Sequence, residues 1–307
     1  MSAATLDLID LDQPLPGQRR FISCWLVRAP GLAFVVDPGP RSTASRLVAR
    51  LRELGVARLD WILLTHVHLD HAGGTAELAA AFPQARVVCH ENGRGHLAAP
   101  GRLWEGSRAV LGQAAEVYGE PAPVPADRLL APAAAGAALV AAGLRVIHTP
   151  GHAPHHLCFL RDGTLFVGEA AGTYAQLPGA APYLRPATPP RFFLEVAVAS
   201  LDRLLALEPP PARLAFAHHG LATRGVTGLL SAARAQLGDW VAALRDERRA
   251  GEPLDDGLLA RMHARLLATD PHYASWRDLD ADIRERELGF TRQTLAGMVE
   301  YLDRPPA

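Results

Sequence analysis

One segment of ten residues constrains the fold of this chain most, because it places four metal-binding side chains directly after an apolar strand. Residues 65–74 read T-H-V-H-L-D-H-A-G-G and include His66, His68, Asp70 and His71. The segment follows an expected strand, residues 59–64, and precedes an expected helix, residues 74–81. Borderline divalent metals prefer imidazole and carboxylate ligands, and α/β folds place their sites where strands end. The segment therefore predicts a metal site at a sheet edge.

The spacing inside the segment separates its side chains into two pairs. Residues two apart in an extended backbone face the same side, so His66 and His68 are placed to bind one ion together. Asp70 and His71 are adjacent where the chain turns into the expected helix, and neighbouring side chains point in different directions. This pair is better placed for a second ion, and the spacing therefore predicts a two-metal site.

Composition excludes several other classes of function. The formal net charge is −1 over 307 residues, so no electrostatic attraction to nucleic acid or to an anionic membrane is expected. All 31 lysine-or-arginine positions are arginine, which excludes a P-loop lysine and a lysine Schiff base. The three cysteines lack a C-x-x-C spacing and are expected to be buried thiols. The amino terminus lacks a signal-peptide pattern, so a cytoplasmic location is expected.

Strand and helix signals alternate up to about residue 225, and only helix signals follow. The expected strands are residues 21–27, 32–36, 59–64, 85–90, 144–147, 157–160, 164–167 and 213–216. Residues 161–163 (R-D-G) predict a hairpin, and Ser42 is expected to cap a helix that ends at Gly55. This order favours an α/β fold with mixed sheets and outer helices. We expect a catalytic domain over residues 1–226 and a helical C-terminal extension, residues 227–307, packed on it.

Four motifs in order resemble those of the metallo-β-lactamase superfamily. The pattern H-x-H-x-D-H followed by small residues is the most specific of them. V-V-D-P-G around Asp37, H-T-P-G-H ending at His152 and F-A-H ending at His218 resemble the family's other motifs. The resemblance covers roughly residues 15 to 225 and implies an αββα sandwich of two mixed sheets, with the metals at one edge between them.

The resemblance also implies a ligand set for two ions. The first ion is expected on His66, His68 and His152. The second is expected on Asp70, His71 and His218. His218 is favoured over His219 as the last ligand because the family's histidine follows a single small residue after an apolar strand end. His219 would then line the pocket.

Glu169 departs from the family pattern, which usually has an aspartate bridging both ions at this position. Glutamate has the same charge but is one methylene longer. Either it still bridges the two ions with a shifted backbone, or the second site is weakened. Replacing Glu169 by aspartate is expected to keep or raise metal occupancy.

Other residues near these motifs are expected to support the site. Asp37 is expected to orient a ligand histidine or the turn below the site. His148, His155 and His156 are expected to be structural, with substrate contact by one of them as the alternative. His90, His96, His263 and His272 have no assigned role. The proline-rich segment 176–191 is expected to wall the pocket, with Tyr174, Tyr183 and Arg185 available for substrate contact.

The resemblance implies a binuclear metallo-hydrolase. Zinc is the expected metal, with a weaker second site, and iron or manganese as alternatives. A metal-bound hydroxide would cleave an ester, thioester or lactone in a small intracellular substrate, with Asp70 relaying a proton. The C-terminal helices resemble those of the hydroxyacylglutathione hydrolase branch, and a homodimer is a further option. The alternatives are an iron-dependent redox enzyme on the same fold, similar to a sulfur dioxygenase, or a metal-bound protein without turnover.

Overall fold

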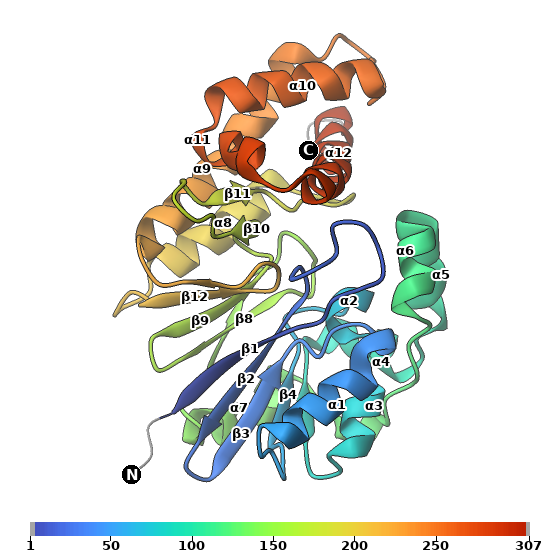
Figure 1. The fold of residues 1–307 in the computed structure, drawn as a ribbon, viewed down its shortest axis with the longest axis vertical. Helices are drawn as coiled ribbons and strands as arrows, with labels where there is room; N and C mark the ends of the chain where they lie inside the picture. Colours follow the sequence, from blue (N-terminus) through green and yellow to red (C-terminus); the bar gives the residue numbers. More distant parts are fainter. Residues whose placement is uncertain (1–3, 305–307) are drawn as a thin grey trace.

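Two β-sheets pack face to face in the computed structural model, which describes residues 4–304, and helices cover both outer faces (Figure 1). The first sheet has the order β1-β2-β3-β4-β5-β6, antiparallel from β1 to β3 and parallel from β3 to β6. Its strands are β1 (Thr5–Asp10), β2 (Ser23–Ala29), β3 (Leu32–Val36), β4 (Trp61–Leu63), β5 (Arg86–Val88) and β6 (Leu129–Leu130). All three residues of β4 are buried, as expected for a parallel strand covered on both faces.

The second sheet has the order β13-β12-β9-β8-β7, in which only β12 and β9 are parallel. Its strands are β7 (Arg145–His148), β8 (Leu157–Arg161), β9 (Thr164–Gly168), β12 (Arg213–Phe216) and β13 (Leu221–Ala222). Asp162 and Gly163 join β8 to β9, and their φ angles of 46° and 70° are those of a tight hairpin turn. The hairpin predicted from the D-G pair is confirmed.

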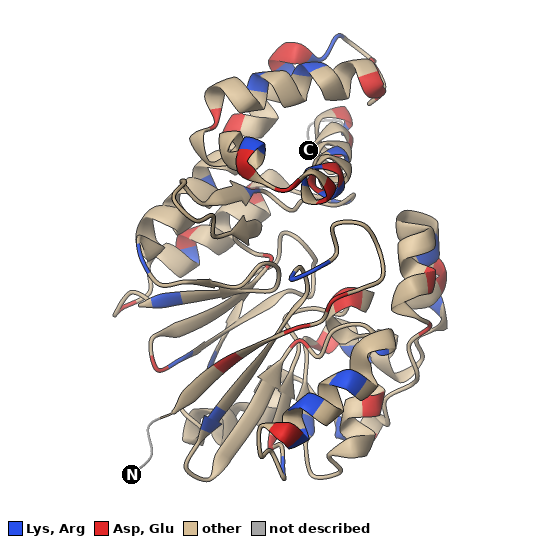
Figure 2. Cartoon of the chain, viewed as in Figure 1, with Lys and Arg blue, Asp and Glu red and all other residues tan. Residues whose placement is uncertain are grey.

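Helices fill the connections between strands. The longer ones in the first two thirds of the chain are α1 (Ala44–Glu53), α3 (Thr75–Ala81), α4 (Glu91–Ala98), α5 (Gly101–Leu111), α7 (Pro132–Ala141) and α8 (Leu194–Leu205). Two short helices, α2 (Leu69–Ala72) and α6 (Gln113–Tyr118), lie between them. Acidic and basic residues are interspersed along α1, α4, α5 and α8, in keeping with the near-zero net charge (Figure 2), whereas α7 carries no charged residue.

Three apolar clusters hold the layers together. The cluster between the sheets contains aromatic side chains of both, including Phe34 and Phe166, whose rings meet edge to face at 6.0 Å. A second cluster joins the first sheet to α1, α3 and α4. A third joins the second sheet to α8 and to the C-terminal helices. The layer order is helix, sheet, sheet, helix, which confirms the expected αββα sandwich.

Several local predictions need correction. Helix α1 begins at Ala44, after a single turn of 3₁₀ helix (Arg41–Thr43), and Ser42 does not cap it. The Ser42 hydroxyl donates instead to Gln13 Oε1 at 3.0 Å, so tertiary contact with the N-terminal segment overrides the local capping pattern. Five strands had no sequence prediction: β1, β6, β13, and the ribbon of β10 (Thr173–Ala175) and β11 (Tyr183–Arg185).

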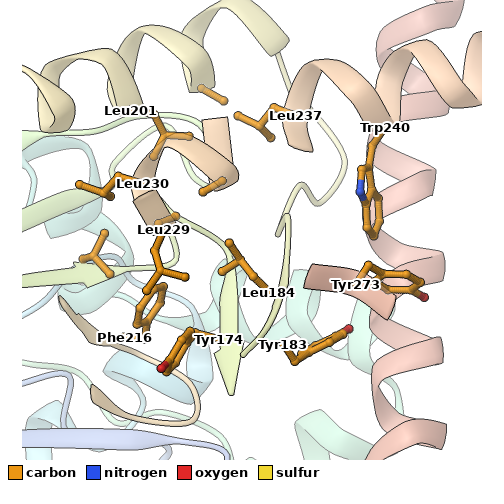
Figure 3. Packing of buried hydrophobic residues seen from close by; sticks show 14 of the residues in the cluster. Tyr174, Tyr183, Leu184, Leu201, Phe216, Leu229, Leu230, Leu237, Trp240 and Tyr273 are labelled. Carbon is orange, nitrogen blue, oxygen red and sulfur yellow. The ribbon is translucent and has the colours of Figure 1, made fainter. Parts of the chain in front are cut away.

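The chain after β13 is helical throughout its described part, as predicted. Its helices are α9 (Val226–Glu247), α10 (Asp256–Thr269), α11 (Pro271–Ala274) and α12 (Ala281–Asp303). Figure 3 shows Trp240 of α9 and Tyr273 of α11 beside Tyr183 of β11. The Tyr273 ring lies 5.0 Å from that of Trp240 and 5.9 Å from that of Tyr183. These helices therefore rest on the β10–β11 ribbon and share its core.

Backbone hydrogen bonds join the two sheets along one edge. Leu157 N donates to Thr65 O at 2.7 Å, Ser23 N donates to Ala217 O at 2.9 Å, and His219 N donates to Phe21 O at 3.1 Å. The strand ends that carry the predicted metal ligands therefore converge on one place. Among the described residues, no helix combines the length and apolar character needed to cross a bilayer.

Candidate metal centre

The seven predicted ligands come from four strand ends and lie together at the edge where the sheets join. The segment after β4 carries His66, and α2 then begins with the extended residue His68 as its N-cap. His152 follows β7, Glu169 follows β9, and His218 follows β12. The expected grouping of these side chains is what the structure shows, although which ions they hold stays a prediction.

The first group consists of His66, His68, His152 and Glu169, whose potential ligand atoms all lie within 4.8 Å of one another. His68 Nδ1 is 3.0 Å from His66 Nε2 and 3.1 Å from His152 Nε2. Three imidazole nitrogens that face one another this closely, beside a carboxylate, form a donor set suited to a divalent transition metal.

The second group consists of Asp70, His71 and His218, again with their potential ligand atoms within 4.8 Å. Asp70 Oδ2 is 3.2 Å from His71 Nε2 and 3.6 Å from His218 Nε2. His71 Nε2 is buried and, within the described part of the chain, makes no hydrogen bond. A buried nitrogen without a partner, aimed at two carboxylates, fits a site that holds a cation.

Glu169 faces both groups. Its Oε2 lies 3.0 Å from His152 Nε2 and 3.3 Å from His71 Nε2, and its Oε1 lies 3.5 Å from His218 Nε2. The longer side chain thus reaches the position expected of a bridging carboxylate. The backbone is fixed by Gly168, whose φ is 56° and whose added Cβ would lie 2.5 Å from His156 Nε2.

Four of the histidines turn Nε2 into the site because their Nδ1 atoms are engaged outside it. His152 Nδ1 donates to Ala187 O at 3.0 Å, and His218 Nδ1 donates to Phe21 O at 3.3 Å. His71 Nδ1 lies 3.3 Å from Asp37 Oδ2. Such contacts fix the ring orientation and the tautomer of metal-binding histidines, so the inward nitrogens carry the free electron pairs that a metal needs.

His66 is also oriented through its Nδ1, but by the Thr65 hydroxyl, which in turn is held by Asp37. The Thr65 hydroxyl donates to Asp37 Oδ2 at 2.6 Å, which leaves its oxygen free to accept from His66 Nδ1 at 3.0 Å. Asp37 also accepts from Thr65 N at 2.7 Å. The predicted role of Asp37, orienting a ligand histidine and the turn below the site, is confirmed by these contacts.

The electrostatics of the site favour the metal-binding forms of His66, His68 and Asp70. Burial, followed by the neighbouring imidazoles, lowers the pKa of His66 well below its usual value and that of His68 to about 3. Burial alone would raise the pKa of Asp70, but His71 and His218 hold it well below the usual range. His66 and His68 are therefore neutral and the Asp70 carboxylate is ionised. Burial would lower the pKa of His71, but Asp70 and then Asp37 raise it well above its usual value, so a bound ion would displace a proton from His71.

His218 and His219 point in different directions, although they are adjacent in the chain. His219 has a φ of 63°, in the left-handed region. Its Nε2 accepts from Arg286 Nη2 at 2.5 Å, away from both ligand groups. Burial, and then Arg286, lower the pKa of His219 to about 3, so its ring stays neutral. Of the two histidines, His218 is the one that the structure places beside Asp70 and Glu169.

Three of the remaining histidines, His156, His263 and His272, have structural contacts. His156 is fully buried, accepts from Glu169 N at 3.2 Å through Nε2, and contacts Thr149 Oγ1 at 2.8 Å through Nδ1. It therefore holds the backbone of Glu169, as expected of a structural histidine. His263 contacts the Tyr273 hydroxyl and His272 contacts Pro182 O, and neither belongs to the ligand groups.

The prediction for the proline-rich segment was wrong about its side chains, and its role as a pocket wall stays a prediction. Residues 186–188 line a small cavity together with His152 and Glu169, and residues of α8 and α9 complete its lining. Tyr183 and Arg185 are not available to a substrate, because both are buried and donate to Glu287 Oε2 at 3.1 and 2.5 Å. Tyr174 is also buried, and its hydroxyl donates to Gln176.

Sequence reasoning missed the residues that support the site from a distance. Phe21, Arg286 and Glu287 lie far apart in the chain from the histidines they support, and no local motif marks them. Thr65 could have been identified from the sequence, because it immediately precedes His66 in the ligand segment. Its hydroxyl lies between Asp37 and His66.

Comparison with known proteins gives consistent results. The family model of the metallo-beta-lactamase superfamily matches residues 17–218. A metallo-beta-lactamase fold-containing protein of Sulfurisphaera tokodaii is 33% identical over 171 residues, which are 53% of this chain and 62% of that protein. A hydroxyacylglutathione hydrolase of Alkalilimnicola ehrlichii is 30% identical over 237 residues, which are 76% of this chain and 75% of that protein. The match thus spans less than two thirds of the Sulfurisphaera protein.

Solved structures share the fold. A metallo-beta-lactamase superfamily protein from Sulfolobus tokodaii aligns with a TM-score of 0.60 at 22% identity, over 89% of this chain and 98% of that one. A metallo-beta-lactamase family protein from Thermus thermophilus aligns with a TM-score of 0.58 at 24% identity, over 97% of this chain and 92% of that one. In the second case the alignment extends over nearly the whole chain, including its C-terminal helices.

Proposed function

This chain belongs to the metallo-beta-lactamase superfamily, and from that premise we propose that it is a metal-dependent hydrolase of a small ester, thioester or lactone. The observation that carries the proposal is the pair of facing ligand groups, with the Glu169 carboxylate directed at both. Two divalent ions, zinc in the first instance, would supply polarisation of the substrate oxygen and a water acidic enough to react near neutral pH.

The side chains of the site would have three roles: binding the ions, separating them, and orienting the reacting water. His66, His68 and His152 would hold the first ion, and Asp70, His71 and His218 the second. Glu169 would keep the two groups at a fixed separation through its two oxygens. Asp70 is ionised and its side chain is 17% exposed, so its carboxylate can accept a hydrogen bond from a reacting water and orient it.

The substrate class rests on similarity and on composition. Several relatives are named hydroxyacylglutathione hydrolase, and they match this chain at 30 to 33% identity. The formal net charge of −1 gives no general attraction for a polyanion, which disfavours nucleic acid as a substrate. A small neutral or singly charged acyl compound is therefore our first candidate.

The test combines metal content with a substrate panel. Purified protein is assayed by elemental mass spectrometry, then with an aryl ester, a hydroxyacyl-glutathione thioester and a γ-lactone. We expect up to two zinc ions per chain and hydrolysis of at least one compound, abolished by a chelator and by Asp70→Asn. Bound iron together with oxygen consumption would replace the hydrolase by a redox enzyme. Full metal occupancy without turnover of any compound would indicate a metal-bound protein that is not a hydrolase.

A further inference from the structure

His218 rests on an aromatic ring that is itself covered by a buried cation. The rings of His218 and Phe21 are stacked, with centroids 4.1 Å apart and an angle of 9° between their planes. The guanidinium carbon of Arg286 lies 3.9 Å from the centroid of the Phe21 ring. His218, Phe21 and Arg286 thus contact in sequence, and the last of them belongs to α12. A cation over an aromatic face is attracted to the ring, most strongly where water is excluded.

Arg286 is held in place by protein groups and has little capacity left for a ligand. Its Nε and Nη2 donate to Glu287 Oε1 at 3.0 and 2.7 Å, and its Nη1 donates to Gly17 O. A further Nη2 hydrogen bond goes to His219 Nε2. Four of the five N–H donors of the guanidinium are therefore engaged: one of Nε, one of Nη1 and two of Nη2.

Glu287 completes this network from the other side. It is fully buried and accepts from Arg185 Nε and from the Tyr183 hydroxyl, both on β11. A buried carboxylate between two guanidinium groups fixes both of them, because moving either would leave a charge unpaired. Arg286 is therefore a rigid support for the Phe21 ring.

The same guanidinium holds the turn that aims His218. His219 adopts a left-handed backbone conformation that residues other than glycine rarely adopt. This turn sends His219 toward α12 and its neighbour His218 toward Asp70 and Glu169. The hydrogen bond from Arg286 is the contact that holds the His219 ring in this direction.

We propose that Arg286 is a positioning residue of the metal centre: through Phe21 and His219 it keeps His218 directed at the second ligand group. The C-terminal helix α12 would then set the affinity of Asp70, His71 and His218 for their ion. This inference rests on the proposed function, because it requires an ion on that group. Within the described part of the chain, Arg286 forms no hydrogen bond or ion pair with the first group, so the affinity of that group depends on other residues.

The test measures the affinity of each ion separately. Full-length protein is stripped of metal and titrated with Zn²⁺ against a competing chelator. Arg286→Met keeps a long apolar side chain but removes the cation and its hydrogen bonds. We expect one of the two Zn²⁺ affinities to fall about 10- to 100-fold, the usual cost of removing a residue that orients a metal ligand, and the other to stay within about twofold.

Arg284→Met is the matched control. Arg284 lies on the same helix, but its guanidinium covers Trp276 and donates to Arg277 O and Leu279 O, away from the ligand groups. Both affinities are expected to stay unchanged in this variant. Arg286→Lys keeps the cation and should recover part of the lost affinity. If Arg286→Met does not fold, Phe21→Leu removes the stacked ring instead and should weaken the same ion.

The outcomes separate this inference from the proposed function. Equal weakening of both ions, or of neither, in folded Arg286→Met would overturn the positioning role. A wild-type protein that binds only one ion would overturn it as well. Two ions without hydrolysis of any test compound would remove the proposed function, while the titration would still decide the role of Arg286.

Discussion

The two ligand groups differ in what supports them. His66 and His152, of the first group, are oriented by nearby sandwich atoms: the Thr65 hydroxyl and the Ala187 carbonyl. In the second group, His218 is oriented by the Phe21 carbonyl and by the Phe21 ring, and the ring contacts the C-terminal helix α12. The residues that orient the first group thus lie within residues 17–218, which match the family model, whereas Arg286, which supports His218, lies outside that range. The comparison suggests that the two ions respond differently to distant changes.

Asp37 and Glu169 are the points at which the two groups are coupled. Asp37 contacts His71 directly and reaches His66 through Thr65. Glu169 directs one oxygen at His152 and His71 and the other at His218. Substitutions at these positions therefore measure how independent the groups are. The predictions below run from the largest expected effect to the smallest.

His66→Ala is expected to have the largest effect, because it removes a buried ligand of the first group. Loss of a catalytic ion removes several kcal/mol of transition-state stabilisation, so hydrolysis should fall by about a thousandfold or more. Elemental mass spectrometry should show one ion lost and the other retained. His96→Ala, which removes an exposed histidine of α4 outside both groups, is the control. Loss of both ions would show that the two groups bind metal as one unit.

Glu287→Gln should produce the largest loss of stability, because it leaves the buried Arg185 and Arg286 without their carboxylate. Breaking a buried ion pair costs about 3–5 kcal/mol of unfolding free energy. Urea unfolding at pH 7 measures this loss. Glu285→Gln, two residues earlier and exposed, is the matched control. A variant as stable as the wild type would mean that the network does not hold α12 in place.

The same residue predicts a pH dependence. Burial would raise the pKa of Glu287, but Arg185 and Arg286 lower it well below its ordinary value of 4.5. The carboxylate is then ionised in the folded protein at pH values where the unfolded chain is already protonated. Its stabilising contribution is therefore complete above about pH 4.5 and is lost as the pH falls below it. Glu287→Gln should lack this part of the acid sensitivity in urea unfolding between pH 7 and pH 3.

Asp37→Ala is expected to weaken the second ion more than the first, because His71 loses its direct acceptor and His66 loses only a relayed one. The affinity of the second ion should fall about 10- to 100-fold.

Asp37→Ala should also lower stability, because the buried Thr65 N–H loses its acceptor, which costs about 1–3 kcal/mol of unfolding free energy. Zn²⁺ titration and thermal unfolding measure the two effects. Asp60→Ala is the control, since Asp60 accepts from Ala33 N far from the ligands. Equal loss of both ions would contradict the difference between the groups.

Glu169→Asp is expected to have the smallest effect, and from the contacts of its backbone we expect a loss of affinity rather than the retained or raised occupancy that the family pattern predicts. The backbone of Glu169 is held by its N–H bond to His156 and by the tight packing at Gly168. Because the backbone is fixed, the shorter aspartate side chain cannot extend as far as glutamate, and its oxygens lie farther from both ligand groups. Both Zn²⁺ affinities should fall together, by about tenfold. Unchanged or raised occupancy, measured by Zn²⁺ titration, would restore the original expectation that aspartate suits the site.

The sequence was most informative where function needs a local pattern. His66, His68, Asp70 and His71 were found from their spacing after a buried strand, and Asp162-Gly163 from its turn chemistry. Spacing and turn type depend on dihedral angles of a few consecutive residues, so a single sequence carries them. The order of the remaining motifs then implied the sandwich and the positions of His152, Glu169 and His218.

Tertiary structure decided the rest. It turned Ser42 from a helix cap into a partner of Gln13, and it buried Arg185 against Glu287, 102 residues away in the chain. It also placed Arg286 behind Phe21 and separated the directions of two adjacent histidines. None of these has a local signature, because an ion pair or a stacked ring depends on which distant surfaces pack together. The sequence alone determined which side chains are candidate metal ligands, and only the packing of α12 against the sandwich determined what supports His218.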